Sequence, residues 1–168
     1  SNCDITGVLD CSNASIETIQ STSGSPNWTG INLYSGAIVD GDTLIVLGAN
    51  LTGLLNLTYL AVSSVTVQNQ SLTEVVFSSL SKSVTNISLN GQNIRTIDFG
   101  GTQFSGFVTI QLQDLNDDGL MTSSEISQMV VDIASRASSG FGVIRFDGNN
   151  PSLNTSGMTA KTTLEGLG

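Results

Sequence analysis

A short apolar pattern recurs along the chain. Each copy holds two apolar residues separated by one position, then a polar turn, then another apolar residue. Because one copy cannot bury its own apolar face, several copies must stack to enclose a common interior. Several steps between copies are about 22 residues, which is typical of repeat proteins. The copies are Leu9/Cys11 with Ile16, Ile31/Leu33 with Ile38, Val65/Val67 with Leu72, and Ile87/Leu89 with Ile94, followed by Ile110/Leu112 and Ile144/Phe146.

Four segments resemble the leucine-rich-repeat family, namely VLDCSNASIETI, VTVQNQSLTEV, NISLNGQNIRTI and VIRFDGNNPS. The resemblance implies an α/β solenoid, an irregular leucine-rich repeat in which short strands stack in parallel from about Gly7 onward. The chain departs from the family pattern at Gln70 and Gln92, where the family usually has an asparagine that bonds along the turns.

Other folds also fit many short aliphatic strands joined by Gly and Asn turns. A parallel β-helix and a Greek-key β-sandwich are the alternatives. The segment TLIVLGANLTGLLNL is either an extra strand or a shortened repeat, and IDFGGTQF, which starts at Ile97, is a candidate for another repeat. The number of repeats is therefore left open.

We expect a single domain over residues 1–168, because this length suffices to bury a core. Residues 1–20 are the expected N-terminal cap. This cap contains Cys3 and Cys11, the only cysteines, and we favour a disulfide between them over two free thiols.

Residues 141–168 are the expected C-terminal cap. Met158, Thr162 and the segment Leu164 to Leu167 are predicted to form a short amphipathic turn that closes the open core, as terminal repeats must. The tail, with TAKTTLEG after a GNNPS turn, resembles the closing segment of repeat proteins of marine bacteria and their phages.

The stretch DLNDDGLMTSSE places oxygen-bearing residues at the spacing of a twelve-residue calcium loop. Such a loop wraps the backbone so that alternate side chains converge on one hard cation, with a glycine at the sixth position for the sharp turn. Over these twelve residues the chain resembles an EF-hand-type loop, with Gly119 at the sixth position. The resemblance implies calcium as a cofactor, held by Asp114, Asn116, Asp118, the Leu120 carbonyl, Thr122 and Glu125.

A second interpretation of the same residues needs no ion. Thr122 and Glu125 have the spacing of a capping box, in which each side chain satisfies a backbone donor at a helix start. Apolar residues at helical spacing follow, so a helix is predicted over about 123–137. The preceding FVTIQLQ alternates apolar and polar residues, which predicts a strand before the loop.

Charge and composition exclude several function classes. Fourteen Asp and Glu oppose five Lys and Arg, which gives a net charge of −9 and disfavours nucleic acid as a partner. The sequence contains no histidine, which excludes a serine–histidine or cysteine–histidine hydrolase. No apolar run approaches the roughly 20 residues of a membrane-spanning helix, so membrane insertion is not expected.

Seven Asn-x-Ser/Thr triplets are candidate glycosylation sites in a secreted chain. The preference of repeat turns for Asn and Thr explains them as well. The triplets begin at Asn13, Asn27, Asn50, Asn56, Asn69, Asn86 and Asn154.

These observations favour a non-enzymatic, calcium-stabilised binding or adhesion module outside the cell, on a cell surface or on a virion. The outward strand positions Thr66, Ser88, Gln111 and Arg145 suit a glycan or a polar protein ligand. The alternative is a structural subunit of a virion, appendage or surface layer that contacts copies of itself. Catalysis by the carboxylates of the 114–125 loop ranks behind both, because they crowd into one turn instead of flanking a cleft.

Overall fold

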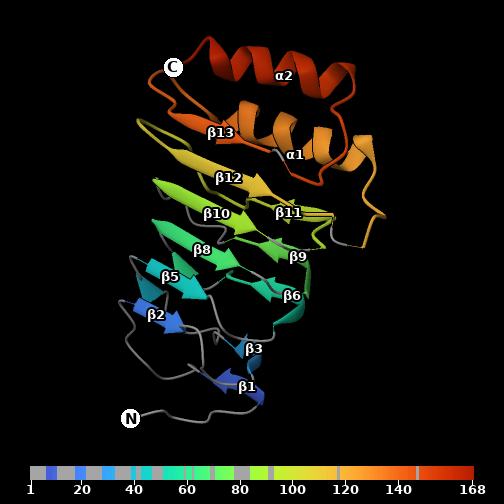
Figure 1. Ribbon diagram of the computed structural model, residues 1–168. Helices are drawn as coiled ribbons and strands as arrows, with labels where there is room; N and C mark the ends of the chain where they lie inside the picture. Colours follow the sequence, from blue (N-terminus) through green and yellow to red (C-terminus); the bar gives the residue numbers. More distant parts are fainter. Residues whose placement is uncertain are drawn as a thin grey trace.

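The computed structural model describes most of the chain, with gaps concentrated in its first half (Figure 1). The described residues are 7–10, 18–21, 28–32, 39–40, 43–46, 51–58, 60–61, 63–68, 71–77, 84–90, 93–116, 118–146 and 148–168. The strands are β1 (Gly7–Asp10), β2 (Thr18–Ser21), β3 (Trp28–Asn32), β4 (Val39–Asp40), β5 (Thr43–Val46), β6 (Thr52–Asn56), β7 (Leu60–Ala61), β8 (Ser64–Gln68), β9 (Ser71–Val76), β10 (Asn86–Asn90), β11 (Thr96–Asp98), β12 (Thr109–Gln113) and β13 (Val143–Arg145). The helices are α1 (Ser123–Arg136) and α2 (Thr155–Glu165).

Two parallel sheets form the body of the described structure. The larger sheet has six strands in the order β13-β12-β10-β8-β5-β2, and the second has three in the order β11-β9-β6. The pairs β1-β3 and β4-β7 form two further small sheets. Every strand pair of the described part is parallel, which the antiparallel Greek-key sandwich would not give.

From β5 onward the chain passes back and forth between the two main sheets, as Figure 1 shows. Each return brings a strand beside its equivalent about one repeat earlier, so that Ile87 aligns with Val65 and with Ile110. Hydrogen bonds join the same turns of successive units, for example from Thr85 to the Ser63 carbonyl 22 residues earlier. The described chain is therefore α/β, with parallel strands in two main sheets and two helices.

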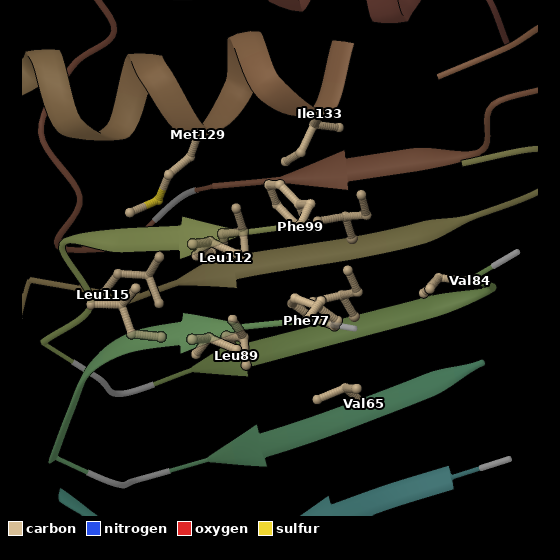
Figure 2. Close-up of a cluster of buried hydrophobic side chains, with 14 of the residues drawn as sticks. Val65, Phe77, Val84, Leu89, Phe99, Leu112, Leu115, Met129 and Ile133 are labelled. Atoms are coloured by element: carbon tan, nitrogen blue, oxygen red, sulfur yellow. The ribbon is translucent and has the colours of Figure 1, made fainter. Parts of the chain in front are cut away.

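The core lies between the two main sheets and under α1. The residues of β8 and β12 alternate between buried and partly exposed positions because successive side chains point to opposite faces of a sheet. The inward residues Val65, Leu89 and Leu112 come from successive strands of the six-stranded sheet, and Figure 2 shows Met129 and Ile133 of α1 pointing toward the same interior. All five are at most 3% exposed.

Four phenylalanines line one side of this interior. Phe77 stacks on Phe99 at 5.7 Å between ring centroids, and Phe104 meets Phe99 edge to face at 5.4 Å. Phe141 continues the series beside Phe104. The contacts of Phe77 with Phe99 and of Phe104 with Phe141 join different units, so they connect those units through the core.

The N-terminal register differs from the prediction. The apolar pattern treats Leu9 and Ile31 as equivalents of Val65 in one stack, but β1 and β3 pair with each other in a separate sheet, with Leu9 aligned to Ile31. The six-stranded sheet instead continues through β5 and β2, so that Leu44 and Ile19 align in turn with Val65. An alternating apolar pair suits a strand of either sheet, so the spacing alone does not assign the sheet.

The structure also assigns the two segments whose role the sequence left open. TLIVLGANLTGLLNL contains both β5 and β6, one strand for each main sheet, so it is more than one extra strand. IDFGGTQF overlaps β11, which belongs to the second sheet and is not another strand of the first.

The helix predicted over 123–137 is confirmed as α1, which is capped by Thr122 and followed by Ala137. At the C-terminal end, where a short amphipathic turn was predicted, α2 has 11 residues and packs on α1 (Figure 1). Its buried face contains Gly157, Ala160 and Leu164, whereas Met158 is 52% exposed. The predicted segment is therefore a full helix, in which Leu164 is buried and Met158 is not. Neither helix of the described part is long and apolar enough to cross a membrane.

Candidate functional site

The outward side of the six-stranded sheet carries polar side chains in regular rows. Thr66, Ser88, Gln111 and Arg145, expected at outward positions, align in one row across β8, β10, β12 and β13. We call the outward side chains of β5, β8, β10, β12 and β13 the polar face. Beside the central row, which begins at Ile45, lie the rows Thr43, Ser64, Asn86, Thr109, Val143 and Gln68, Asn90, Gln113.

Hydrogen bonds connect neighbouring strands across the polar face. The Asn86 amide donates to the Ser64 hydroxyl at 3.2 Å and to the Thr66 hydroxyl at 3.4 Å. The Ser88 hydroxyl donates to Gln111 Oε1 at 3.3 Å. Ser88 is only 7% exposed. These bonds hold the side chains in a fixed array, so the polar face is partly preorganised for a ligand.

The polar face is free of negative charge. None of the six strands of its sheet contains an acidic residue, although the chain has 14 Asp and Glu, and the only charged residue in these strands is Arg145. The second sheet, in contrast, carries Glu74 in β9 and Asp98 in β11. The strands of this sheet therefore carry no negative charge, although the chain as a whole is acidic.

The calcium-like loop connects β12 to α1, which gives the predicted order of strand, loop and helix. Asp114 begins it with a positive φ of 51°, and its Oδ1 accepts a hydrogen bond from the Asn149 amide at 2.9 Å. The Asn149 side-chain oxygen accepts in turn from the Asn116 amide. Asn116 Oδ1 accepts from the Met121 amide at 2.7 Å. The first two predicted ligands are therefore tied to the turn that follows β13.

Asp118 is held by the preceding unit. Its carboxylate pairs with the guanidinium of Arg95 and accepts from the Leu120 amide at 3.0 Å, while its own amide donates to Asn93 at 2.8 Å. These donors, first the Leu120 amide and then Arg95, hold the pKa of Asp118 below its ordinary value. The carboxylate is therefore ionised and already has a cationic partner.

Glu125 and Thr122 form the capping box that was the ion-free interpretation of these residues. Glu125 Oε2 accepts from both the amide and the hydroxyl of Thr122 at 2.7 Å, and the Glu125 amide donates back to the Thr122 hydroxyl. The hydroxyl bond and then the amide bond of Thr122 lower the pKa of Glu125. The predicted twelfth ligand thus caps α1.

The carboxylates of the described loop residues do not converge. Within residues 93–116 and 118–146, and elsewhere in the described chain, no three His, Cys, Asp or Glu side chains gather as a metal-binding group. Leu120, whose carbonyl was expected as a ligand, has an exposed side chain. A calcium ion held by these residues has to compete with Arg95 for Asp118 and with Thr122 for Glu125.

A cleft of about 270 Å³ lies between α1 and the start of β11. Its lining includes the charged residues Arg95, Glu125 and Asp132 and the apolar residues Ile97 and Met129. The sequence analysis did not single out Asp132. Glu125 is held ionised by its cap, so it does not suit the role of a general acid in this cleft at neutral pH.

Three of the seven glycosylation candidates are described. Asn86 is half-buried and its amide group is used within the polar face. Asn154 is exposed and caps α2 through its side-chain oxygen, and exposed Asn56 accepts from the amide and hydroxyl of Thr58. Asn13, Asn27, Asn50 and Asn69 lie outside the described residues, as do Cys3 and Cys11 with their predicted disulfide.

Sequence reasoning missed the side chains that hold the loop in place, which are Asn93, Arg95, Asn149 and Asn150. Asn150 accepts from the Leu115 amide at 2.8 Å and donates to the Leu112 carbonyl at 2.5 Å. Arg95 and Asp118 are 23 residues apart, which is about one repeat step. A search for opposite charges one repeat apart would have found that pair.

No protein-family model, curated protein or solved structure matches the chain. Its function is therefore inferred from the polar face and from the loop.

Proposed function

We propose that this chain is a non-enzymatic binding or adhesion module that acts outside the cell or on a virion and uses the polar face as its contact surface. The observation that carries the proposal is the alignment of Thr66, Ser88, Gln111 and Arg145 in one row without any carboxylate. Side chains that are already held in place on a sheet offer a broad contact area, and a ligand can bind them at a small cost in side-chain conformational entropy.

The architecture that we propose for this module is a leucine-rich-repeat-like solenoid. Support comes from the 22-residue step between Ser63 and Thr85 and the 23-residue step between Ser88 and Gln111. The asparagine bonds from Asn150 to the preceding unit also support it. In such a stack each unit contacts only its neighbours, and the combined units offer one extended surface.

Two observations support binding over catalysis. The carboxylates Asp118 and Glu125 are held in their ionised state by donors of the protein, which suits neither for a general acid at neutral pH. The described side chains of the polar face include no carboxylate, and the chain has no histidine. The usual proton-transfer groups are therefore missing from the proposed contact surface.

Calcium stabilisation remains part of the proposal. Asp114, Asn116, Asp118, the Leu120 carbonyl, Thr122 and Glu125 are the residues that would hold the ion, which would neutralise the charge of the loop. A ligand that binds only the folded state adds about 2.7 kcal/mol at one hundred times its Kd. Because Arg95 already pairs with Asp118, calcium gains less from this carboxylate than it would in an unpaired loop.

A structural subunit is the second candidate, and the neutral polar face is also compatible with contacts between copies. The two roles predict different behaviour in solution. A binding module stays monomeric as the concentration rises, whereas a subunit assembles through large contacts. Light scattering coupled to size exclusion, from micromolar to high concentration, separates them.

The contact surface is tested with a matched pair of substitutions. Thr66→Glu places a carboxylate on the polar face, and Thr73→Glu makes the same change at an exposed position of β9 in the second sheet. The probe is a panel of immobilised polysaccharides and extracellular-matrix proteins, read by biolayer interferometry. We expect the wild type to bind at least one member, Thr66→Glu to weaken that binding, and Thr73→Glu to leave it unchanged. Equal effects of the two variants would place the contact elsewhere.

A further inference from the structure

The chemistry of the polar face identifies a class of ligand. Hydroxyl and amide side chains both donate and accept hydrogen bonds, whereas carboxylates only accept and ammonium or guanidinium groups only donate. Thr66, Gln111 and Gln113 are partly exposed members of this kind. A surface made of such groups is complementary to a ligand that is itself rich in hydroxyls.

The same surface lacks what a protein partner would need. Protein interfaces obtain most of their binding energy from buried aromatic and Arg anchors surrounded by a polar rim. The strands of the polar face contain no aromatic residue, and its large apolar side chains, Ile45 in β5 and Val143 in the edge strand β13, lie away from the central strands β8, β10 and β12. The centre of the face therefore offers many weak polar contacts and no apolar anchor.

The only charge of these six strands lies at one end of the polar face. In a chain with a net charge of −9, the six strands of this sheet hold one charge, the exposed Arg145 in the edge strand β13. A neutral polymer is not repelled anywhere along the face. A polymer with acidic groups is attracted at the β13 end alone, where a guanidinium can take a carboxylate or sulfate.

The rows repeat across the strands, which are about 4.8 Å apart. A polymer that crosses the strands therefore meets the hydroxyl and amide side chains of Thr66, Gln111 and the rows beside them, and its weak contacts add up as linked binding events do. We infer that the polar face binds an extended polysaccharide that runs across the strands along the row from Thr66 to Arg145. This inference rests on the proposed function and names its ligand.

The test is affinity gel electrophoresis of the full chain in gels that contain hydroxyethyl cellulose, dextran, xylan or alginate. We expect at least one polysaccharide to retard the wild type, and we expect short oligosaccharides of the same sugar to compete far less well than the polymer. Gln111→Glu, which changes charge with little change in shape, should raise the Kd about tenfold or more because it introduces a charge that the ligand must desolvate. Gln103→Glu, at an exposed position outside the strands, should not raise it. Unchanged melting temperatures by circular dichroism show that both variants are folded.

Retardation by none of the four polymers would overturn the inference. So would equal weakening by Gln111→Glu and Gln103→Glu, or equal competition by short oligosaccharides and polymer. Binding only to proteins of the interferometry panel, with sensitivity to Thr66→Glu and not to Thr73→Glu, would overturn the polysaccharide inference and leave the proposed binding role intact. Arg145→Gln should weaken retardation by alginate and leave retardation by the neutral polymers unchanged.

Discussion

The guanidinium of Arg95, just before β11, pairs with the carboxylate of Asp118, which lies in the loop after β12. The two residues are 23 positions apart, so the pair links successive units of the chain. Arg95 also adds to the lowering of the Glu125 pKa, after the two hydrogen bonds from Thr122. One side chain of the preceding unit thus supplies positive charge to the acidic loop.

This pairing predicts how the chain responds to calcium. We expect millimolar calcium to raise the melting temperature relative to chelator, and Asp118→Ala to remove most of that increase. Arg95→Met should enlarge the increase, because Asp118 then has no competing cation. This variant also removes a buried nitrogen, Nη1, for which the described structure shows no hydrogen-bond partner. Differential scanning fluorimetry measures all three, and identical melting with calcium and with chelator in every variant would show that the loop needs no ion.

The acidic loop also predicts a pH dependence. The pKa values of Asp118 and Glu125 are lowered in the folded state, so the unfolded state binds more protons over the range between the folded and unfolded values. Their contribution to stability is complete above the ordinary values of about 3.9 for Asp and 4.3 for Glu, and it is lost as the pH falls through the folded values.

Urea midpoints should therefore be level from neutral pH down to about 5 and fall below about 4. The double variant Asp118→Asn, Glu125→Gln should fall less steeply over the acidic range, because the two groups no longer titrate. An unchanged slope in this variant would assign the acid sensitivity to other carboxylates. The same urea midpoints measured at low and high salt add a check, because salt screens interactions between exposed charges.

The capping box provides a third prediction. Thr122→Ala removes the hydroxyl that accepts from the Glu125 amide, so α1 loses an N-terminal partner. The expected cost is about 1 kcal/mol of unfolding free energy, the usual effect of deleting a helix cap. Thr122→Ser keeps the hydroxyl and serves as the matched control. Urea denaturation followed by circular dichroism measures both, and equal midpoints for the alanine and serine variants would show that the cap contributes nothing.

The sequence predicts local elements well where one pattern decides them. The strand before the calcium-like loop and the helix after it follow from alternation, helical spacing and the pair of Thr122 with Glu125, and the outward row of Thr66, Ser88 and Gln111 follows from period-two alternation. Each of these patterns lies within a few consecutive residues, so it can be recognised without knowing which other strands or helices the segment contacts.

The sequence does not predict which strands lie side by side in the first half. Leu9 and Val65 stand in similar apolar patterns, yet β1 pairs with β3 and β8 belongs to the six-stranded sheet. Strand pairing depends on packing against the rest of the core, which an alternating pattern does not encode. The partners of the loop, such as Asn149 for Asp114, are likewise contacts between units.

The packing of α2 on α1 gives a fourth prediction. Gly157 lies so close to Ser127 that a Cβ at this position would be 2.6 Å from the Ser127 hydroxyl oxygen and 3.0 Å from its Cα. In an open helix Gly→Ala stabilises by about 1 kcal/mol, but overpacking a tight contact costs about 1–3 kcal/mol. Because part of the clash is with backbone, we expect Gly157→Ala to destabilise the chain by about 1–2 kcal/mol.

The double-mutant cycle with Ser127→Gly tests the cause. This second change removes the Ser127 side chain from the contact, at the cost of the bond that its hydroxyl accepts from the Asn154 amide. We expect Gly157→Ala to be better tolerated in the Ser127→Gly background than in the wild type, which gives a favourable coupling energy between the two sites. Additive effects in urea denaturation would mean that the helices move apart to accept the methyl group, and the close approach of α2 to α1 would then not limit the size of this residue.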